Sequence, residues 1–386
     1  MNNLKNNKKK TTGFGRLIKG SNRTISENQK TTIIKERRAL ELLNQSKFEE
    51  AEQIYRELIS LGTKNHVVFN NLGIITGFKG NNVEKIQLLQ KGLKLQSKDY
   101  KTLNNLGNAY NSQGEYNKAI EVYQKALEIK PNYSSAHVGI GNSYKSKGLI
   151  DSAIISYKKA LSINPTYAEA LNNLGAIIYQ KGDIHEAIKS YKKALKLKPD
   201  FPEALNNLGV ALYEIGEIKM AIKTFKQALL LKPIYNEARF NLSRAQLLIG
   251  DYKNGWNNYD ARWKKASPTK LHSEKPNLPK WKGEILQQKE KLLIISEQGL
   301  GDTIQFMRYI PFLRSQNIDI SFCAEEKLHT LIKSSKIDQN PIMPNDVNQV
   351  TEGKWIELLS LPKYLDISSN HPIVNNPYLK ASEKLV

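Results

Sequence analysis

The stretch with the strongest chemical pattern is SEQGLGDTIQF, residues 296–306. An apolar run, KLLIIS, leads into two glycines and an aspartate, and a helical pattern follows. Strand-to-helix turns of this kind often hold the reacting or anionic part of a ligand, because the amides of the helix start point at it. The glycines would let the backbone come close to such a ligand, since no Cβ intrudes. The candidate residues are Glu297, Gly299, Gly301, Asp302, Thr303 and Gln305.

Asp302 has two interpretations from its position. An aspartate at a helix start with Gln305 three residues later fits a capping box, which requires no chemistry. The alternative is a reacting carboxylate, and one side chain can do both. Glu297 is a second carboxylate, with a structural role favoured. The loop lacks the Gly-Lys-Ser/Thr ending of a phosphate loop, and Ile304 breaks the dinucleotide fingerprint.

Neither a metal site nor a reactive thiol is predicted. The six histidines lie far apart in the sequence without the paired spacing of metal ligands. Cys323 is the single cysteine, so it cannot form an internal disulfide. It lies in an apolar strand pattern without nearby cationic residues, and we expect a buried, unreactive thiol.

The elements around the loop indicate a parallel α/β arrangement. The sequence predicts a strand over 291–296, a helix of about 13 residues from 303, a strand over 318–324 and a helix over 325–335. Strands that alternate with helices are typical of parallel sheets. Prolines at 268, 276 and 279 mark an irregular connector before them.

Most of the chain before this region follows a period of 34 residues. Glycine recurs at 107, 141, 175 and 209, alanine at 119, 153, 187 and 221, and proline at 131, 165, 199 and 233. Each period contains two amphipathic helices, the first ended by glycine and the second stopped by proline. The pattern resembles the tetratricopeptide repeat family. We expect about seven units over 32–269, strongest over 100–235, with degenerate ends.

A regular file of asparagines precedes the leucine of the first helix in most units. It comprises Asn71, Asn105, Asn173, Asn207 and Asn241, and Gly139 interrupts it. Carboxamides offer a donor and an acceptor each, which suits the backbone of an extended peptide in the groove of a solenoid. The units resemble those of O-GlcNAc transferase, whose peptide groove is lined in a similar way. The alternative is that asparagine here serves only the fold.

The region after 250 resembles bacterial proteins that fuse tetratricopeptide repeats to a heptosyltransferase-like domain. The resemblance covers residues 32–380 and is carried by WKGE (281–284), LLIISEQGLGDTIQFMRYIPFL (292–313), ELLSLPKYL (357–365) and PYL (377–379). It implies a GT-B fold, in which two Rossmann-like halves face across a cleft. It also implies that Asp302 is the general base, which takes a proton from an acceptor hydroxyl as that hydroxyl attacks a sugar's anomeric carbon.

In that fold the first half holds the acceptor and the second holds a nucleotide sugar such as UDP-GlcNAc. Residues 291–386 are too few for both halves, so we expect the donor-binding half to be absent, no cofactor to be held and little transfer by this chain alone. The fold class predicted is therefore an α-solenoid of tetratricopeptide repeats followed by a small, incomplete, Rossmann-like α/β domain. An active O-linked glycosyltransferase, completed by a missing half, is the alternative.

Charge and composition limit the partners. The net charge is +21, of which eight Lys and Arg against Glu27 place +7 in residues 1–31. We expect a disordered basic tail there, repeats over 32–269, a linker over 270–290 and the partial α/β domain over 291–386. The remaining positive charge would favour nucleic acid or acidic partners, but a solvated lysine-rich surface is the simpler interpretation. No apolar run is long enough to span a bilayer, and a cytoplasmic protein is expected, in an oligomeric state that the sequence leaves open.

Overall fold

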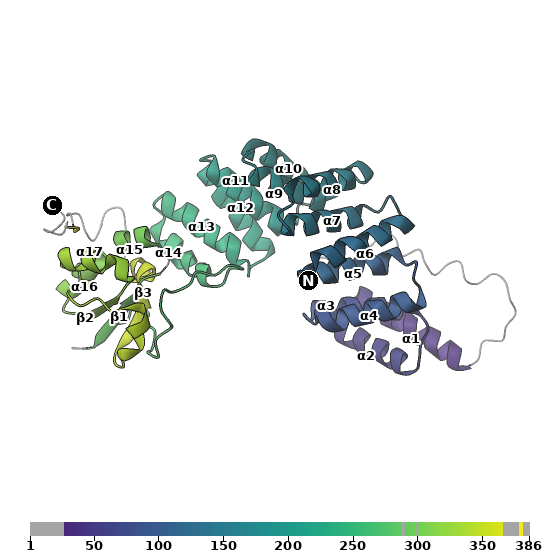
Figure 1. The fold of residues 1–386 in the computed structure, drawn as a ribbon, viewed down its shortest axis with the longest axis horizontal. Helices are drawn as coiled ribbons and strands as arrows, with labels where there is room; N and C mark the ends of the chain where they lie inside the picture. Colours follow the sequence, from purple (N-terminus) through teal and green to yellow (C-terminus); the bar gives the residue numbers. More distant parts are fainter. Residues whose placement is uncertain (1–26, 287–289, 298, 366–377, 381–386) are drawn as a thin grey trace. The chain divides into compact units, whose positions relative to one another are not determined.

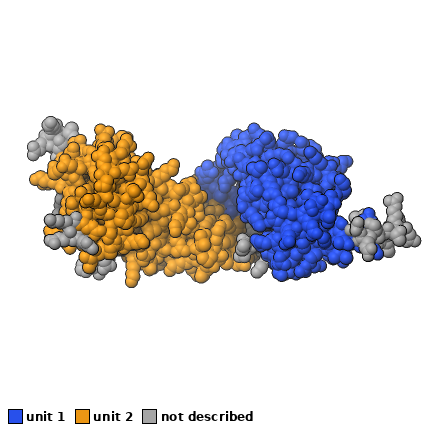
Figure 2. Space-filling model, turned by 90° about the horizontal axis from the view of Figure 1, so that it is seen from below, with its two compact units in different colours: residues 1–181 blue, residues 182–386 orange. Residues whose placement is uncertain are grey.

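The computed structural model describes residues 27–286, 290–297, 299–365 and 378–380. The chain divides into two compact units, residues 1–181 and residues 182–386 (Figure 2). Unit 1 is built from helices, and unit 2 contains further helices followed by a small α/β domain (Figure 1). None of the described helices combines the length and the apolar character that a bilayer-spanning helix needs.

Unit 1 is a stack of helical hairpins. Its helices are α1 (Glu27–Asn44), α2 (Phe48–Ser60), α3 (His66–Phe78), α4 (Asn82–Leu95), α5 (Tyr100–Ser112), α6 (Tyr116–Ile129), α7 (Ser134–Ser146), α8 (Ile150–Ile163) and α9 (Ala168–Gln180). Odd-numbered helices are the first helices of the repeats, and even-numbered helices are the second ones. The predicted helical repeats are confirmed. Helix α1 begins at Glu27, five residues before the predicted boundary, and the rest of the predicted tail lies outside the described residues.

Glycine and proline end the helices where the sequence indicates. Gly114 follows the end of α5 with a φ of 79°, a left-handed conformation that side-chain-bearing residues rarely adopt. Gly80, Gly148, Gly182, Gly216 and Gly250 occupy the equivalent place with positive φ. Helix α6 ends at Ile129, two residues before Pro131, whose ring cannot continue it.

Tyr123 fills the space between two hairpins. Its side chain is 0% exposed, and a Cβ added to Gly107 would lie 2.5 Å from the tyrosine Cε1. A Cβ at Gly139, in the next repeat, would lie 2.3 Å from its Cζ. Distances this short exclude a side chain unless the ring moves. A side chain at position 139 would therefore meet the ring of Tyr123.

Successive first helices lie closer to one another than successive second helices do. Helix α5 contacts both α3 and α7, while no pair of successive second helices is comparably close in the described part of unit 1. Hairpins that approach more closely along one layer curve toward that layer. The first helices therefore line the concave side of the stack, which is the side that repeat proteins use for extended ligands.

Unit 2 begins with α10 (Ile184–Leu197), α11 (Pro202–Glu214), α12 (Ile218–Leu231), α13 (Asn236–Leu248) and α14 (Tyr252–Tyr259). The second helix of the last hairpin, α14, has eight residues and passes into a short 3-10 helix, η2 (Asp260–Trp263). Equivalent second helices such as α12 have fourteen residues. This shortened end accords with the degenerate terminal repeat that the sequence predicts.

The α/β domain has a three-stranded, all-parallel sheet in the order β2-β1-β3. The strands are β1 (Lys291–Ile295), β2 (Asp319–Cys323) and β3 (Lys354–Glu357). The predicted strands before and after the glycine turn are confirmed, whereas β3 was not predicted. Four consecutive side chains of β1, Leu292 to Ile295, are 0% exposed, as expected of a central strand covered on both faces.

The helix predicted as one element from 303 is wrong in its length. The chain forms two shorter helices, α15 (Leu300–Phe306) and α16 (Tyr309–Ser315), interrupted at Met307 and Arg308. Pro311 explains the break, because it has no N–H to donate to the carbonyl of Met307. The predicted helix after β2 is found as η3 (Glu326–Leu328) followed by α17 (His329–Ser334). The described chain continues through η4 (Pro344–Gln349), η5 (Leu358–Ser360) and α18 (Leu361–Tyr364).

Candidate functional site

Three asparagines of the file donate side-chain hydrogen bonds to asparagines of the preceding repeat. Asn105 Nδ2 donates to Asn70 Oδ1 at 2.9 Å, and Asn173 Nδ2 donates to Asn142 Oδ1 at 2.9 Å. In unit 2, Asn241 Nδ2 donates to Asn206 Oδ1 at 3.0 Å. These bonds join successive first helices, so part of the hydrogen-bonding capacity of the file is used inside the stack.

The two remaining members of the file are also engaged. Asn71 is 9% exposed, and its Nδ2 donates to the hydroxyl of Tyr55 at 3.0 Å. Asn207 is half-buried and has an interaction partner. The structural interpretation of the file therefore has direct support. Asn173 uses both ends of its amide, since its Oδ1 accepts from Asn172 Nδ2 at 3.3 Å, whereas Asn105 Oδ1 has no partner among the described residues. The role of the file in binding peptides stays a prediction.

A second set of asparagines lies one helical turn further along the first helices. The Tyr123 hydroxyl donates to Asn108 Oδ1 at 2.7 Å, and the Tyr157 hydroxyl donates to Asn142 Oδ1 at 2.6 Å. Asn108 and Asn142 were not predicted as site residues, because asparagine at this position is found in only two of the strong repeats. The available signal was that Asn108 lies three residues after Asn105 of the file.

The glycine turn places Asp302 on the surface without a capping role. Gly299 is the N-cap of α15, with a φ of 94°, and Asp302 is the third residue of the helix. No side-chain capping bond is formed there, so the capping-box interpretation is wrong. Gln305 is exposed, while the Thr303 hydroxyl donates to the carbonyl of Gly299 at 3.2 Å. The turn is held by backbone and threonine contacts.

Asp302 has no ion-pair or hydrogen-bond partner among the described residues. A Cβ built at Gly299 would lie 3.1 Å from its Oδ2, so glycine leaves room for the carboxylate to fold back over the turn. Although Asp302 is exposed, partial desolvation by its surroundings raises the pKa of its carboxyl above the ordinary value. Gly301 is also exposed and has open space where a Cβ would point.

Glu297 is a buried carboxylate held by Arg262. Glu297 and Arg262 are each 1% exposed, and they form a two-pronged ion pair with Nε–Oε2 and Nη2–Oε1 distances of 2.9 Å. Glu297 Oε1 also accepts from the amide of Leu359 at 3.2 Å. Burial raises the pKa of the Glu297 carboxyl, and the charge of Arg262 opposes that rise. This geometry gives Glu297 a structural position.

Arg262 occupies the place where parallel sheets commonly bind ligands. Ligands of such sheets lie outside the carboxyl ends of the strands, where the strand order reverses, and here that place is between β1 and β3. Glu297 follows β1 and Ser360 follows β3, and the guanidinium bonds to both, with an Nη2–Oγ distance of 2.8 Å to Ser360. The last hairpin thus inserts a side chain into the sheet's crevice.

Arg262 and Ser360 were missed by reasoning from the sequence. The available signal was an arginine flanked by aromatic residues, since the guanidinium carbon lies 4.6 Å from the ring centroids of both Tyr259 and Trp263. Cys323 is buried as predicted, and burial raises the pKa of its thiol to about 12. Within the described residues, no group of three or more His, Cys, Asp or Glu side chains is arranged to hold a metal ion.

Comparison with known families identifies the repeats. A family described as TPR repeat matches residues 107–148, 141–182 and 177–216, and one described as Tetratricopeptide repeat matches residues 202–235. Residues 107–235 are tetratricopeptide repeats. The matched residues end before the α/β domain, so its similarity to sugar transferases stays a proposal. No curated protein matches the chain in a sequence comparison.

Two solved structures are similar to part of the chain. The Cut9 and Hcn1 hetero-tetramer of the APC/C matches with 18% identity and a TM-score of 0.53, over 58% of this chain and 44% of that one. A thermophilic TPR protein of Thermus thermophilus, TTC0263, matches with 23% identity and a TM-score of 0.43, over 47% and 99% of the two chains. At 18% identity the likeness to the Cut9 and Hcn1 structure describes the fold alone.

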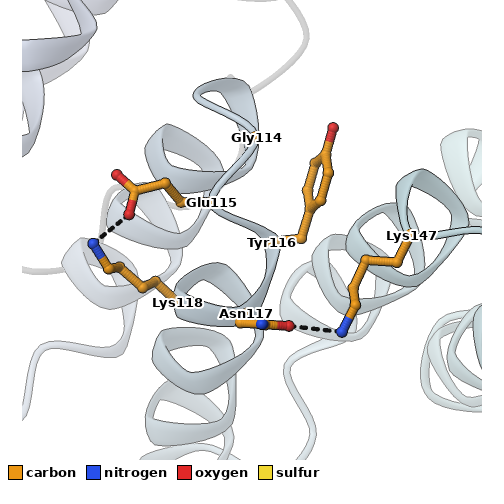
Figure 3. A pocket seen from close by; sticks show the side chains of 6 residues that line it. All are labelled: Gly114, Glu115, Tyr116, Asn117, Lys118 and Lys147. Carbon is orange, nitrogen blue, oxygen red and sulfur yellow. Dashed lines mark hydrogen bonds and ion pairs between the residues drawn. The ribbon is translucent and has the colours of Figure 1, made fainter.

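A shallow hollow of about 290 Å³ lies between the turn that joins α5 to α6 and Lys147 at the end of α7 (Figure 3). Lys147 donates to Asn117 Oδ1 at 2.6 Å, and Lys118 pairs with Glu115. Lys181 and Asp151 make a comparable contact one repeat later, at 2.7 Å. Because these groups bond to one another, the hollow presents little unpaired chemistry, and we do not favour it as a binding site.

Proposed function

We propose that the tetratricopeptide repeats bind an extended segment of a partner protein along the first-helix layer. The observation that carries this proposal is the set of carboxamides on that layer, which tie neighbouring first helices together and still have unused donors and acceptors. Asn105 donates inward through Nδ2, and its Oδ1 has no partner in the part of the chain that the structure describes. A peptide backbone needs both kinds of group, and a row of carboxamides supplies them without reading side chains.

A small hollow in unit 2 supports the same function. It is lined by Val210, Tyr213, Glu214, Phe225, Asn241 and Arg244, which come from α11, α12 and α13. Asn241 belongs to the predicted file, and the Arg244 guanidinium stacks over the Tyr213 ring at 5.0 Å. Apolar, aromatic and hydrogen-bonding groups therefore lie together on the first-helix side of this unit, a composition typical of protein-binding surfaces.

The test is peptide binding by the full chain and by two asparagine or glutamine variants. A library of extended peptides is screened by fluorescence anisotropy, and the best binder is titrated. Asn105→Ala should weaken its binding about fivefold to tenfold, the effect of one lost hydrogen bond. Gln124→Ala removes an exposed carboxamide from the second helix α6 and should leave the affinity unchanged. Equal affinities for both variants, measured on folded protein, would contradict the proposal.

A second candidate function concerns the α/β domain. We propose that it corresponds to the acceptor half of a sugar transferase, with Asp302 as the base that receives the proton of an acceptor hydroxyl. The parallel order β2-β1-β3 and the unpaired carboxylate on the glycine turn support this assignment. The Arg262 side chain fills the crevice between β1 and β3, so an acceptor would have to bind on the outer side of the turn, toward Asp302.

Transfer activity separates this candidate from a purely structural domain. The chain alone, supplied with UDP-GlcNAc and hydroxyl-bearing peptides, should show little transfer. A fusion that adds a nucleotide-sugar-binding Rossmann-like half after Val386 should transfer the sugar, and Asp302→Asn should abolish that transfer. Activity that survives the Asp302→Asn substitution would exclude Asp302 as the base.

A further inference from the structure

The asparagines of unit 1 differ in which end of the amide is used inside the stack. Asn105 uses its Nδ2, which donates to Asn70. Asn108 and Asn142 use their Oδ1 instead, which accepts from the Tyr123 and Tyr157 hydroxyls at 2.7 and 2.6 Å. The Nδ2 groups of Asn108 and Asn142 have no hydrogen-bond partner among the residues that the structure describes. These two side chains therefore present donors.

The orientation of these amides is fixed by buried tyrosines. Tyr123 and Tyr157 are 0% exposed, and their rings lie where a Cβ on Gly107 or Gly141 would otherwise be, at 2.5 and 2.6 Å. A ring held this tightly keeps its hydroxyl in one place. Burial also raises the pKa of both hydroxyls, so they stay protonated and able to donate. Asn142 Oδ1 receives a second bond from Asn173 Nδ2 at 2.9 Å, which leaves only its Nδ2 outward.

The first helices α3, α5 and α7 also lack negative charge, which favours an acidic ligand. The sequences of α3, α5 and α7 contain no aspartate or glutamate. The second helices α6 and α8 do carry carboxylates, at Glu121, Glu128 and Asp151. Asp99, which precedes α5, accepts from the amide of Lys101 and from the Thr102 hydroxyl, so it is used as a helix cap.

Two lysines lie on the same helix faces as the outward amides. Lys101 is seven residues before Asn108 on α5, and Lys145 is three residues after Asn142 on α7. Both lysines are exposed, and neither ammonium has an ion-pair partner among the described residues. The face of α5 and α7 thus combines outward amide donors with cations.

We propose that unit 1 binds an acidic extended segment across α5 and α7, with the Nδ2 groups of Asn108 and Asn142 donating to its carboxylates. This inference rests on the proposed peptide-binding function and specifies the chemistry of the partner. Lys101 and Lys145 add attraction that is sensitive to salt, because both are solvent-exposed. Hydrogen bonds to charged acceptors are stronger than those to neutral ones, so carboxylates are preferred over amide carbonyls.

The first test compares peptides that differ only in charge. A labelled peptide rich in glutamate, its glutamine counterpart and its lysine counterpart are titrated into the full chain by fluorescence anisotropy. The glutamate peptide should bind at least about tenfold more tightly than the glutamine peptide, with an affinity that falls as salt is added. Equal binding of the glutamate and glutamine peptides would overturn the inference and leave the proposed function intact. Absence of binding by any peptide would refute both.

The second test reverses the polarity of the outward atoms. The double variant Asn108→Asp and Asn142→Asp keeps an oxygen for the tyrosine hydroxyls and replaces each outward NH2 by a carboxylate oxygen. It should lower the affinity for the glutamate peptide about tenfold or more. Gln124→Glu adds one such carboxylate to α6 and should leave the affinity nearly unchanged. Asn108→Ala provides an uncharged variant, which should also weaken binding.

The alternative ligand for this positively charged face is RNA, a polyanion of another class. Single-stranded RNA is titrated in parallel at the same salt concentration. Tighter binding of RNA than of the glutamate peptide, unaffected by the Asn108→Asp and Asn142→Asp substitutions, would overturn the assignment of an acidic peptide. RNA that binds weakly and does not displace the peptide would support it.

Discussion

Arg262 and Glu297 form a two-pronged ion pair in which each residue is only 1% exposed. They are separated by 35 residues in the chain, and they connect the last helical hairpin to the loop after β1. Ser360 extends the connection to the loop after β3. Within unit 2, the repeats and the sheet are therefore joined by a buried, directional contact.

Removing Arg262 should strongly destabilise unit 2. Arg262→Ala would leave Glu297 as an unpaired buried charge, which costs about 3–5 kcal/mol. All four tryptophans of the chain, at 256, 263, 281 and 355, lie in unit 2, so tryptophan fluorescence during urea denaturation reports on this unit. Lys219→Ala removes an exposed lysine from α12 of the same unit and should change the stability by less than about 0.5 kcal/mol. Matching midpoints for the two variants would show that the pair is not a strong contact.

Replacing Asp302 should leave the stability of the chain unchanged. Asp302 makes no capping bond, so Asp302→Ala should alter the free energy of unfolding by less than about 0.5 kcal/mol. Asp99→Ala removes a cap that bonds to the amide of Lys101 at 3.1 Å, and it should cost about 1 kcal/mol. Urea denaturation followed by circular dichroism distinguishes the two. A loss at Asp302 as large as that at Asp99 would restore the capping interpretation.

Restoring the interrupted asparagine file should destabilise the stack. Gly139→Asn forces a side chain against the ring of Tyr123, which has no room for it, and should cost about 1–3 kcal/mol. Gly148→Asn is the control, because Gly148 has open space around its Cβ position and asparagine tolerates its φ of 75°. Thermal unfolding measured by circular dichroism should show a clear decrease for the first variant and a small one for the second. A stable Gly139→Asn variant would mean that the tyrosine can move aside.

The repeats should lose stability at alkaline pH. Burial raises the pKa of Tyr55 from 10.0 to about 12, and it raises the pKa of Tyr123 and Tyr157 in the same direction. Above pH 10 the unfolded chain releases these protons while the folded chain keeps them, so the folded state binds more protons and its stability falls as pH rises toward 12.

Helix content and phenolate absorbance, followed together against pH, test this expectation. The last part of the rise in phenolate absorbance should coincide with the loss of helix above pH 10, because the buried tyrosines ionise with unfolding. Tyr157→Phe is a conservative variant, because Phe225 occupies the equivalent position in a later repeat, and it should weaken the pH dependence. Full ionisation of all tyrosines without loss of helix would contradict the prediction.

The repeat architecture could be predicted because its determinants are local and periodic. Gly114 and Pro131 end their helices through backbone conformations that the residue types themselves impose. The break at Met307 was not predicted, because the apolar pattern continues across it and a proline is also tolerated in the first turn of a helix, as Pro311 is in α16. Strand β3 was missed because its four residues are too few to show a clear pattern.

The candidate site could be predicted only in part. The sequence determined that asparagines recur on the first helices, but the direction of each amide depends on partners in neighbouring repeats, such as Tyr123 for Asn108. The amino-acid pattern around Asp302 was compatible with a cap, whereas the structure begins the helix at Leu300, three residues earlier than predicted. Local sequence cannot distinguish a helix that starts at Leu300 from one that starts at Thr303, since Asp302 lies at the beginning of the helix in both cases.

The sequence by itself determined the period, the helix ends and the central strand of the sheet, because each depends on neighbours within a few residues. Tertiary structure alone decided that Arg262 meets Glu297 and Ser360, 35 and 98 residues further along the chain. It also decided which atom of each asparagine faces outward. Hydrogen bonds and buried ion pairs are directional and short in range, so they exist only once distant segments have packed into place.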